Sequence, residues 1–256
     1  MSGAPNLPRL YELIELESVD SAFDEAVRRA KRGAEEGTLV WARVQAAGHG
    51  RLGQPWHSQR GDLHCALVLR PEYPREIALQ LNYVAAVSAG VALAALVSPM
   101  ISLHYRWPND ILLSGAKAAG LLLNTSAGEE PEWLVLGLAV NVGSYPRTRD
   151  YWATSVHAVE GSSEITEIQV LEGYARSFLS WINRWANEGF EPVRKAWLQR
   201  RDPSTPQVEL RLASETVRGR FVDIDERGDV VVDPPEGGRR KIGLVEFYGL
   251  PPAATQ

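Results

Sequence analysis

The chain has 256 residues, which is enough for one large domain, or for a large domain with a small appendage, and for a substantial core. Its formal charge of −5, from 27 basic and 32 acidic residues, argues against a general nucleic-acid-binding surface. The single cysteine, Cys65, excludes a disulfide framework or a cysteine-rich zinc site within one chain, and its apolar neighbours favour a buried side chain.

The sequence carries no pattern typical of secretion or of a membrane span. Residues 1–16 lack a basic segment followed by an apolar one, and the longest apolar tract, residues 84–97, is interrupted by Ser88 and Gly90. A span needs about 20 apolar residues, and a signal peptide needs a continuous apolar region. We therefore expect a cytoplasmic protein that does not act on a membrane.

The first elements lead to a glycine-rich loop. Residues 9–17 alternate loosely and favour a strand, and residues 21–37 have the spacing of an amphipathic helix that ends at a glycine. Residues 38–46 are rich in β-branched and aromatic side chains and predict a buried strand. This strand runs directly into AGHGRLGQPW, residues 47–56.

Strand and helix patterns then alternate as far as a proline-containing break. Strands are expected at residues 62–71, at residues 101–110 and twice within residues 118–143, and helices at residues 75–97, 168–188 and 190–200. Residues 200–207 contain two prolines, a serine and a threonine, which is typical of a linker. We expect a larger α/β unit over residues 1–203 and a small all-β module, resembling a barrel, over residues 207–250.

The glycine loop is the first candidate for chemistry. Without Cβ atoms, backbone N–H groups can approach an anion or a flat ligand. The letters from Gly48 to Gly53 fit the dinucleotide pattern G-x-G-x-x-G, but no helix pattern follows, so that interpretation is weak. Arg51 is either a solvated surface residue or the group that neutralises a carboxylate or phosphate at the loop.

Three blocks together resemble the catalytic domain of biotin protein ligases. They are VQAAGHGRLGQPWHS, RWPNDILLSGAKAAGLLLNT and LVLGLAVNVG, and ESVDSA at residues 17–22 is similar to a further element of that family. The resemblance covers most of residues 9–145, and WPND with its downstream lysine is its most specific part. It implies a mixed, largely antiparallel sheet with packed helices, an α+β arrangement.

The resemblance also implies roles at the acid. Ser18 and Gln45 would bind the ureido ring of biotin, which suits an amide that both donates and accepts hydrogen bonds. The loop residues Gly48, His49, Gly50 and Gly53 would close over the ligand. Trp56 would pack against biotin or the ordered loop, although a tryptophan is more often part of a core.

The catalytic and nucleotide roles fall on other residues of the same blocks. Arg51 would face the carboxylate of biotin and the α-phosphate of ATP, and Lys117 would reach the same oxygens unless it is a solvated loop lysine. The remaining binding residues would be Asn109, Asp110, Gly120 and Asn141. Asn109 could instead only cap a turn, and a structural hydrogen bond is an alternative for Asn141.

The implied reaction activates an acid at the phosphorus of ATP. The carboxylate attacks the α-phosphate, diphosphate leaves, and a lysine of a biotin carboxyl-carrier domain attacks the mixed anhydride. Such a site needs positive charge where oxygens accumulate charge, with Mg²⁺ to screen the phosphates, and no protein nucleophile or protein-bound metal. The family resemblance also makes a homodimer an expectation.

Several positions depart from the family pattern. His49 and Gln54 stand where arginines are expected, and a neutral hydrogen bond is weaker than a charge-assisted one. Val19, Asp20 and the pair Leu138 and Ala139 are further departures, at the biotin and nucleotide sides. A ligase for lipoate or octanoate, or a non-catalytic relative that binds the acid or the carrier domain, therefore stays open as an alternative.

Two further sequence features narrow these alternatives. Lipoyl ligases are expected to show an R-R-x-S-G-G-G-x-V-x-H block, which the sequence lacks. The catalytic pattern begins within about 10 residues of the start, so we expect neither an N-terminal helix-turn-helix nor a repressor role.

Overall fold

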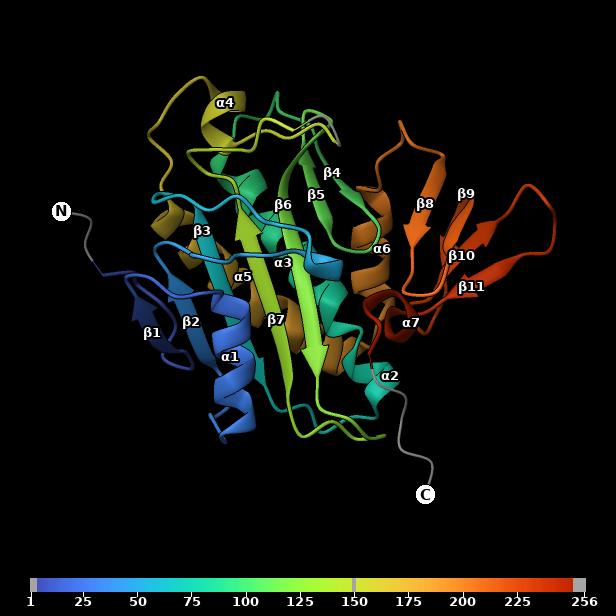
Figure 1. The fold of residues 1–256 in the computed structure, drawn as a ribbon, viewed down its shortest axis with the longest axis horizontal. Coiled ribbons are helices and arrows are strands. Elements are labelled where there is room, and N and C mark those ends of the chain that lie inside the picture. Colours follow the sequence, from blue (N-terminus) through green and yellow to red (C-terminus); the bar gives the residue numbers. More distant parts are fainter. Residues whose placement is uncertain (1–3, 149–150, 251–256) are drawn as a thin grey trace.

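Two sheets and seven helices make up the part of the chain that the structure, a computed structural model, describes: residues 4–148 and 151–250. The larger sheet has the strand order β1-β2-β3-β7-β6-β5-β4, and the smaller one has the order β11-β10-β9-β8 (Figure 1). Only β1 and β2 pair in parallel, and every other strand pair is antiparallel. The expected mixed, largely antiparallel α+β fold is confirmed.

The strands of the larger sheet are β1 Glu12–Leu16, β2 Thr38–Ala42, β3 Leu63–Leu69, β4 Leu103–Arg106, β5 Asp110–Leu113, β6 Ala116–Thr125 and β7 Leu134–Val140. The helices around it are α1 Ala22–Lys31, α2 Arg75–Ala78, α3 Leu81–Leu96, α4 Val156–Glu160, α5 Glu167–Glu188 and α6 Glu191–Gln199. The C-terminal part contains β8 Gln207–Arg211, β9 Thr216–Ile224, β10 Val230–Asp233, β11 Arg240–Ile242 and α7 Leu244–Tyr248.

Helices cover both faces of the larger sheet. α1 packs on one face against β2, β3 and β7, and α3 and α5 pack together on the other (Figure 1). Alternate residues of β3 therefore enter different cores: Cys65 belongs to the cluster beneath α3 and α5, and Ala66 to the cluster beneath α1. Because both faces are covered, β2 and β3 are buried along their whole length, and Thr38 and His64 are the polar residues in them.

α3 is buried on almost every side, which explains its composition. The segment Arg75–Leu96 is long and apolar enough to cross a membrane by length and composition alone. However, 83% of its most apolar window is buried between the sheet and the neighbouring helices. The apolar character of the segment is thus accounted for by the core.

The structure differs from the sequence expectations at several boundaries. The single helix expected over residues 75–97 is divided into α2 and α3, because Gln80, Asn82 and Tyr83 donate backbone hydrogen bonds three residues back rather than four. The helix expected to reach Gly37 ends at Lys31, where Gly33 adopts a φ of +90°. The strand β5 and the short helices α4 and α7 were not expected from the sequence.

The smaller sheet packs against the larger unit through aromatic side chains. Trp197 of α6 stacks between Tyr105 and Phe221, with ring centroids 5.8 and 6.3 Å away. Tyr83 of α3 donates a hydrogen bond of 2.5 Å to the carbonyl of Gly228 in the turn before β10. One continuous apolar cluster contains buried residues of both sheets.

Candidate active site

A cavity of about 840 Å³ lies on the face of the larger sheet that carries α1. Its walls come from the start of α1, the glycine loop, the β4–β5 hairpin and β6, and from β8 and α7 of the C-terminal part. The residues that line it include Ser21, Gln45, His49, Arg51, Trp56, His64, Asn109, Asp110, Lys117 and Gly120. The cavity is therefore where the blocks identified in the sequence meet.

The glycine loop folds back on itself as a narrow hairpin. The Gly50 N–H donates to the carbonyl of Gln54 over 2.6 Å, and the Trp56 N–H donates to the carbonyl of Gly48 over 2.9 Å. Leu52 and Gly53 at its tip have φ values of +56° and +70°. Glycine adopts this left-handed conformation at little cost, whereas leucine is strained there.

Gln45 is fixed by α1 and by the loop itself. Its Oε1 accepts a hydrogen bond of 2.8 Å from the N–H of Ala22, a free donor in the first turn of α1. A Cβ on Gly48 would lie 2.6 Å from the Gln45 Nε2, so only glycine permits this placement. The amide thus offers its NH₂ group, rather than its oxygen, to a ligand in the cavity.

Arg51 reaches across the cavity to the C-terminal part of the chain. Its Nη1 donates to the carbonyl of Phe247 over 2.9 Å, and its Nη2 donates to the carbonyl of Arg211. The guanidinium carbon lies 3.8 Å from the centre of the Phe247 ring. Burial lowers the pKa of Arg51, while Tyr248 and Asp110 act in the opposite direction.

Lys117 and Asp110 form an ion pair at the opposite wall. The Lys117 Nζ lies 2.6 Å from the Asp110 Oδ1, and both side chains are about one-fifth exposed. β5 and β6 pair antiparallel with a register shift next to Ile111, which brings the two side chains together. The same Nζ lies 5.4 Å from the Trp56 ring and 5.5 Å from the Tyr151 ring.

Asn109 and Gly120 shape the same wall. The Asn109 Nδ2 donates to the carbonyl of Leu121 over 3.0 Å, and the Leu121 N–H donates back to the carbonyl of Asn109. A Cβ on Gly120 would lie 3.1 Å from the Trp56 ring and 3.5 Å from the Lys117 Cε. Gly120 thereby lets the tryptophan and the lysine pack against β6.

Four residues expected at the site do not line the cavity: Ser18, Gly48, Gly53 and Asn141. Ser18 is exposed and does not line the cavity, whereas Ser21 does, and its hydroxyl accepts a hydrogen bond from the Asp24 N–H as the N-cap of α1. Asn141 is 2% exposed, and its Nδ2 donates to the carbonyl of Thr154 over 2.9 Å. This is the structural hydrogen bond that the sequence offered as the alternative to a nucleotide-binding role. No partner for the Asn141 Oδ1 is present among the described residues.

His49, which replaces an expected arginine, is held by charge. Its Nε2 lies 2.9 Å from the Asp24 Oδ2, and its Nδ1 lies 3.0 Å from the carbonyl of Gly50. Burial lowers the pKa of His49, but the Gly50 carbonyl, Asp24 and Asp20 outweigh it, so the pKa is raised above 6.5. The Gly50 carbonyl and the two carboxylates thus favour the protonated form of the imidazole.

The sequence motifs did not identify His64 of β3 as part of this site. It is 1% exposed, it lines the cavity, and its Nε2 has no hydrogen-bond partner among the described residues. Burial lowers its pKa to about 4, so the imidazole is neutral at pH 7. Only its place on a strand next to the glycine loop could have suggested it.

The cavity wall is more basic than acidic, although the whole chain is acidic. Its basic residues are Arg51, Arg106, Lys117 and Arg211, and its acidic residues are Asp110 and Glu209. Such a wall favours a negatively charged ligand. Among the described residues, no group of three or more His, Cys, Asp or Glu side chains could hold a metal ion.

The fold and this site define a protein that holds an organic acid beside a cluster of fixed positive charge. The chain belongs to the biotin/lipoate A/B protein ligase family, whose model matches residues 7–199.

Individual relatives agree with this assignment. The biotin--[acetyl-CoA-carboxylase] ligase of Paracoccus denitrificans is 33% identical over 91% of this chain and 99% of its own length. The bifunctional ligase/repressor of Bacillus subtilis is 31% identical over 88% of this chain and 70% of its own length.

Solved structures are similar over nearly the whole chain. A biotin protein ligase from Aquifex aeolicus in complex with biotin and ATP has a TM-score of 0.76 and 27% identity, with 92% of this chain and 97% of that chain covered. A biotin protein ligase-like protein of unknown function from Silicibacter sp. TM1040 has a TM-score of 0.77 and 25% identity. The match covers 94% of this chain and 97% of that chain.

Proposed function

We propose that this protein is an ATP-dependent biotin protein ligase, which adenylates biotin and transfers it to a lysine of a biotin carboxyl-carrier domain. One observation carries the proposal: Gln45, Arg51 and Lys117 line one cavity in a chain of this family. The relatives named as biotin ligases and the complex with biotin and ATP support it.

The cavity offers biotin one polar donor and an apolar wall. Gln45 donates its NH₂ group to the ureido oxygen, because its own oxygen already accepts from Ala22. Phe23 lines the apolar side, and a Cβ on Gly137 would lie 2.7 Å from its ring, so glycine makes room for it. A flat bicyclic ligand suits this combination of few polar groups and a largely apolar wall.

The charged part of the cavity suits the activation step. As the carboxylate attacks the α-phosphate, charge accumulates on the phosphoryl oxygens, and Arg51 and Lys117 donate hydrogen bonds to them. Diphosphate leaves, and the carrier lysine then attacks the mixed anhydride and displaces AMP. His64, which is neutral and has a free ring nitrogen, lies near the acid without adding charge.

Mg²⁺ would enter this site with the nucleotide. The single carboxylate beside Lys117, Asp110, is already paired, and Mg²⁺ bound to ATP is held mostly by phosphates, water and one or two carboxylates. The donor set therefore fits a metal carried by phosphate better than a metal held by the protein. When bound, Mg²⁺ screens the charge of the phosphates.

The sequence left two other functions open. A ligase for lipoate or octanoate would use the same cations but a longer apolar slot. A non-catalytic relative is favoured by His49 and Gln54 in place of the family arginines. Against that relative, the basic wall provides positive charge for a polyphosphate.

We also propose the expected setting of the enzyme. The enzyme acts in the cytoplasm, where it meets the carboxylase that carries its acceptor domain. It does not bind nucleic acid, because the acidic chain has no general surface for it. A homodimer formed by sheet extension would use β1, which ends the order of the larger sheet. Light scattering at several concentrations tests the dimer, and a monomer at all of them would contradict it.

The function is tested by diphosphate release. The purified protein is incubated with ATP, Mg²⁺ and either biotin, lipoate or octanoate, with Lys117→Gln as the inactive variant and Lys241→Gln, on the exposed side of β11, as the control. We expect release with biotin and roughly 100-fold slower release in Lys117→Gln. Release with lipoate alone would favour the second ligase, and tight biotin binding without release would favour the non-catalytic relative.

A further inference from the structure

We propose that Phe247 of α7 is a positioning residue, which holds Arg51 of the glycine loop at the place where charge develops. The inference rests on the proposed function and gives the C-terminal part of the chain a role in the activation step. It starts from the observation that the contacts fixing the guanidinium all come from β8 and α7, not from the loop that carries it.

The guanidinium is restrained on its face and on its edge. The Phe247 ring covers the face at 3.8 Å, and the carbonyls of Phe247 and Arg211 accept from Nη1 and Nη2. An arginine has five N–H donors, so three make no hydrogen bond to the described residues. Those donors remain for oxygens in the cavity, which Arg51 also lines.

α7 is itself attached to the β4–β5 hairpin, whose Asp110 forms the ion pair with the second cation, Lys117 of β6. The Phe247 ring meets the Trp107 ring edge to face, with centroids 4.9 Å apart. The Tyr248 hydroxyl donates to the Asn82 Oδ1 over 2.9 Å, and the Asn82 Nδ2 donates to the carbonyl of Pro108 over 3.2 Å. α7 thereby fixes Arg51 relative to the β4–β5 hairpin and its Asp110–Lys117 ion pair.

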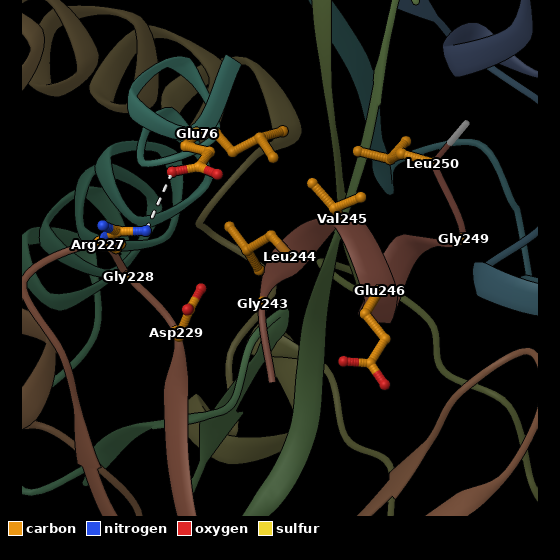
Figure 2. Close-up of a pocket in the computed structure, with 11 residues that line it drawn as sticks. Glu76, Arg227, Gly228, Asp229, Gly243, Leu244, Val245, Glu246, Gly249 and Leu250 are labelled. Atoms are coloured by element: carbon orange, nitrogen blue, oxygen red, sulfur yellow. Dashed lines mark ion pairs between the residues drawn. The ribbon is translucent and has the colours of Figure 1, made fainter. Parts of the chain in front are cut away.

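The other side of α7 packs into the core through Leu244 and also borders a cavity. This second cavity has a volume of about 450 Å³ and is lined by Leu244, Val245 and Glu246 and by the Glu76–Arg227 ion pair across the opening (Figure 2). α7 is thus a thin wall between two cavities. Its hold on Arg51 depends on the contacts of Phe247 and Tyr248 on the ligand side.

The ring face is the property that a variant must remove. Phe247→Leu keeps an apolar side chain and the backbone carbonyl but loses the π face, whereas Phe247→Tyr keeps that face. Phe221→Leu is the matched control, because Arg201 lies 4.9 Å from the Phe221 ring and Phe221 is similarly buried, yet it does not line the ligand cavity.

The test measures biotin-dependent diphosphate release, the Kd for biotin alone and the melting temperature of each variant. We expect Phe247→Leu to lower kcat about tenfold, a loss typical of one cation–π contact, with the Kd changed less than threefold. The kcat of Phe247→Tyr should be close to that of the wild type, and the kcat of Phe221→Leu should lie within twofold of it.

A double-mutant cycle separates positioning from general destabilisation. In an Arg51→Ala background, Phe247→Leu should cost nothing further, because its effect passes through the guanidinium. If Phe247→Leu caused the same loss of rate in both backgrounds, the inference would be overturned. It would also be overturned if the wild type were active and Phe247→Leu had the same rate. Neither result would contradict the proposed function. A wild type without diphosphate release would contradict the proposed function, and the inference with it.

Discussion

Gln45 and Gly48 form a tightly packed pair in the ligand cavity. The amide lies where the Cβ of any other residue at position 48 would be, and α1 holds its oxygen. The sequence placed both residues near biotin by resemblance. It could not show that the amide acts as a donor, since this depends on the N–H of Ala22, which is 23 residues away.

Gly48→Ala should therefore weaken biotin binding about tenfold or more, because the new methyl group displaces the Gln45 amide. Gly50→Ala is the comparison within the same loop: its nearest atom would be 3.7 Å away, which is an ordinary contact, so the loss should be smaller. Calorimetric titration with biotin measures both. Equal affinities for the two variants would contradict this account of Gln45.

His49 gives the glycine loop a dependence on pH. Its pKa is raised in the folded protein, so its ion pair with Asp24 contributes stability that is fully present below the unfolded pKa of about 6.5 and is lost as pH rises through the higher folded pKa. Burial alone would have lowered the pKa of His49.

The stability difference between the wild type and His49→Gln should consequently shrink between pH 6 and pH 8. Urea unfolding at several pH values measures it, and NMR titration of the imidazole gives the pKa directly. Asp24→Asn should remove most of the pH dependence. A His49 pKa below 6.5 would show that desolvation prevails over the carboxylates.

At the scale of elements, the apolar strands and long helices could be predicted, and the hairpin at the site could not. β7 is apolar throughout, and β3 is apolar except for His64, because both faces of the sheet are covered. α5 begins at a capping box formed by Thr166 and Gln169. β5 has only four residues and begins at the aspartate of Pro-Asn-Asp, a pattern that equally predicts a loop. Its pairing with β6, across the tight turn at Ser114 and Gly115, was therefore missed.

Asp62 joins two elements beside the site. Its Oδ1 accepts hydrogen bonds from the N–H groups of Val142, Gly143 and Ser144 at 2.9, 2.9 and 3.0 Å, and its Oδ2 accepts from the Ser144 hydroxyl. The carboxylate is 1% exposed and holds the turn that follows β7. Nothing in the sequence near Asp62 indicates this turn 80 residues away.

Asp62→Ala should lower the free energy of unfolding by about 2–4 kcal/mol, because several buried donors lose a charged acceptor. Asp225→Ala is the control, since Asp225 also accepts backbone hydrogen bonds in a turn but is partly exposed, and about 1 kcal/mol is expected there. Denaturant unfolding measures both variants. Equal losses would contradict the importance of burial at Asp62.

At the scale of the whole molecule, the two sheets share one core. The prolines, serine and threonine of residues 200–207 predict a boundary between two units there. The packing of Trp197 between rings of both sheets was not visible in the sequence, because it depends on how α6 is placed. We propose that residues 1–203 and 207–250, although distinct in architecture, unfold together.

Trp197→Ala should destabilise the whole protein by about 3–5 kcal/mol, in one transition. Trp152→Ala is the control, because Trp152 is 86% exposed and a surface change costs about 0.5 kcal/mol or less. Calorimetry with near-ultraviolet circular dichroism follows both variants. Two separate transitions in the wild type would show that the units are independent.

The central claim is that this cavity activates biotin for transfer to protein. The most direct measurement is mass spectrometry of an isolated carrier domain after incubation with the protein, biotin, ATP and Mg²⁺. We expect one biotin on the carrier lysine, dependent on ATP and lost in Lys117→Gln. A carrier domain that stays unmodified, although an established ligase biotinylates the same preparation, would contradict it.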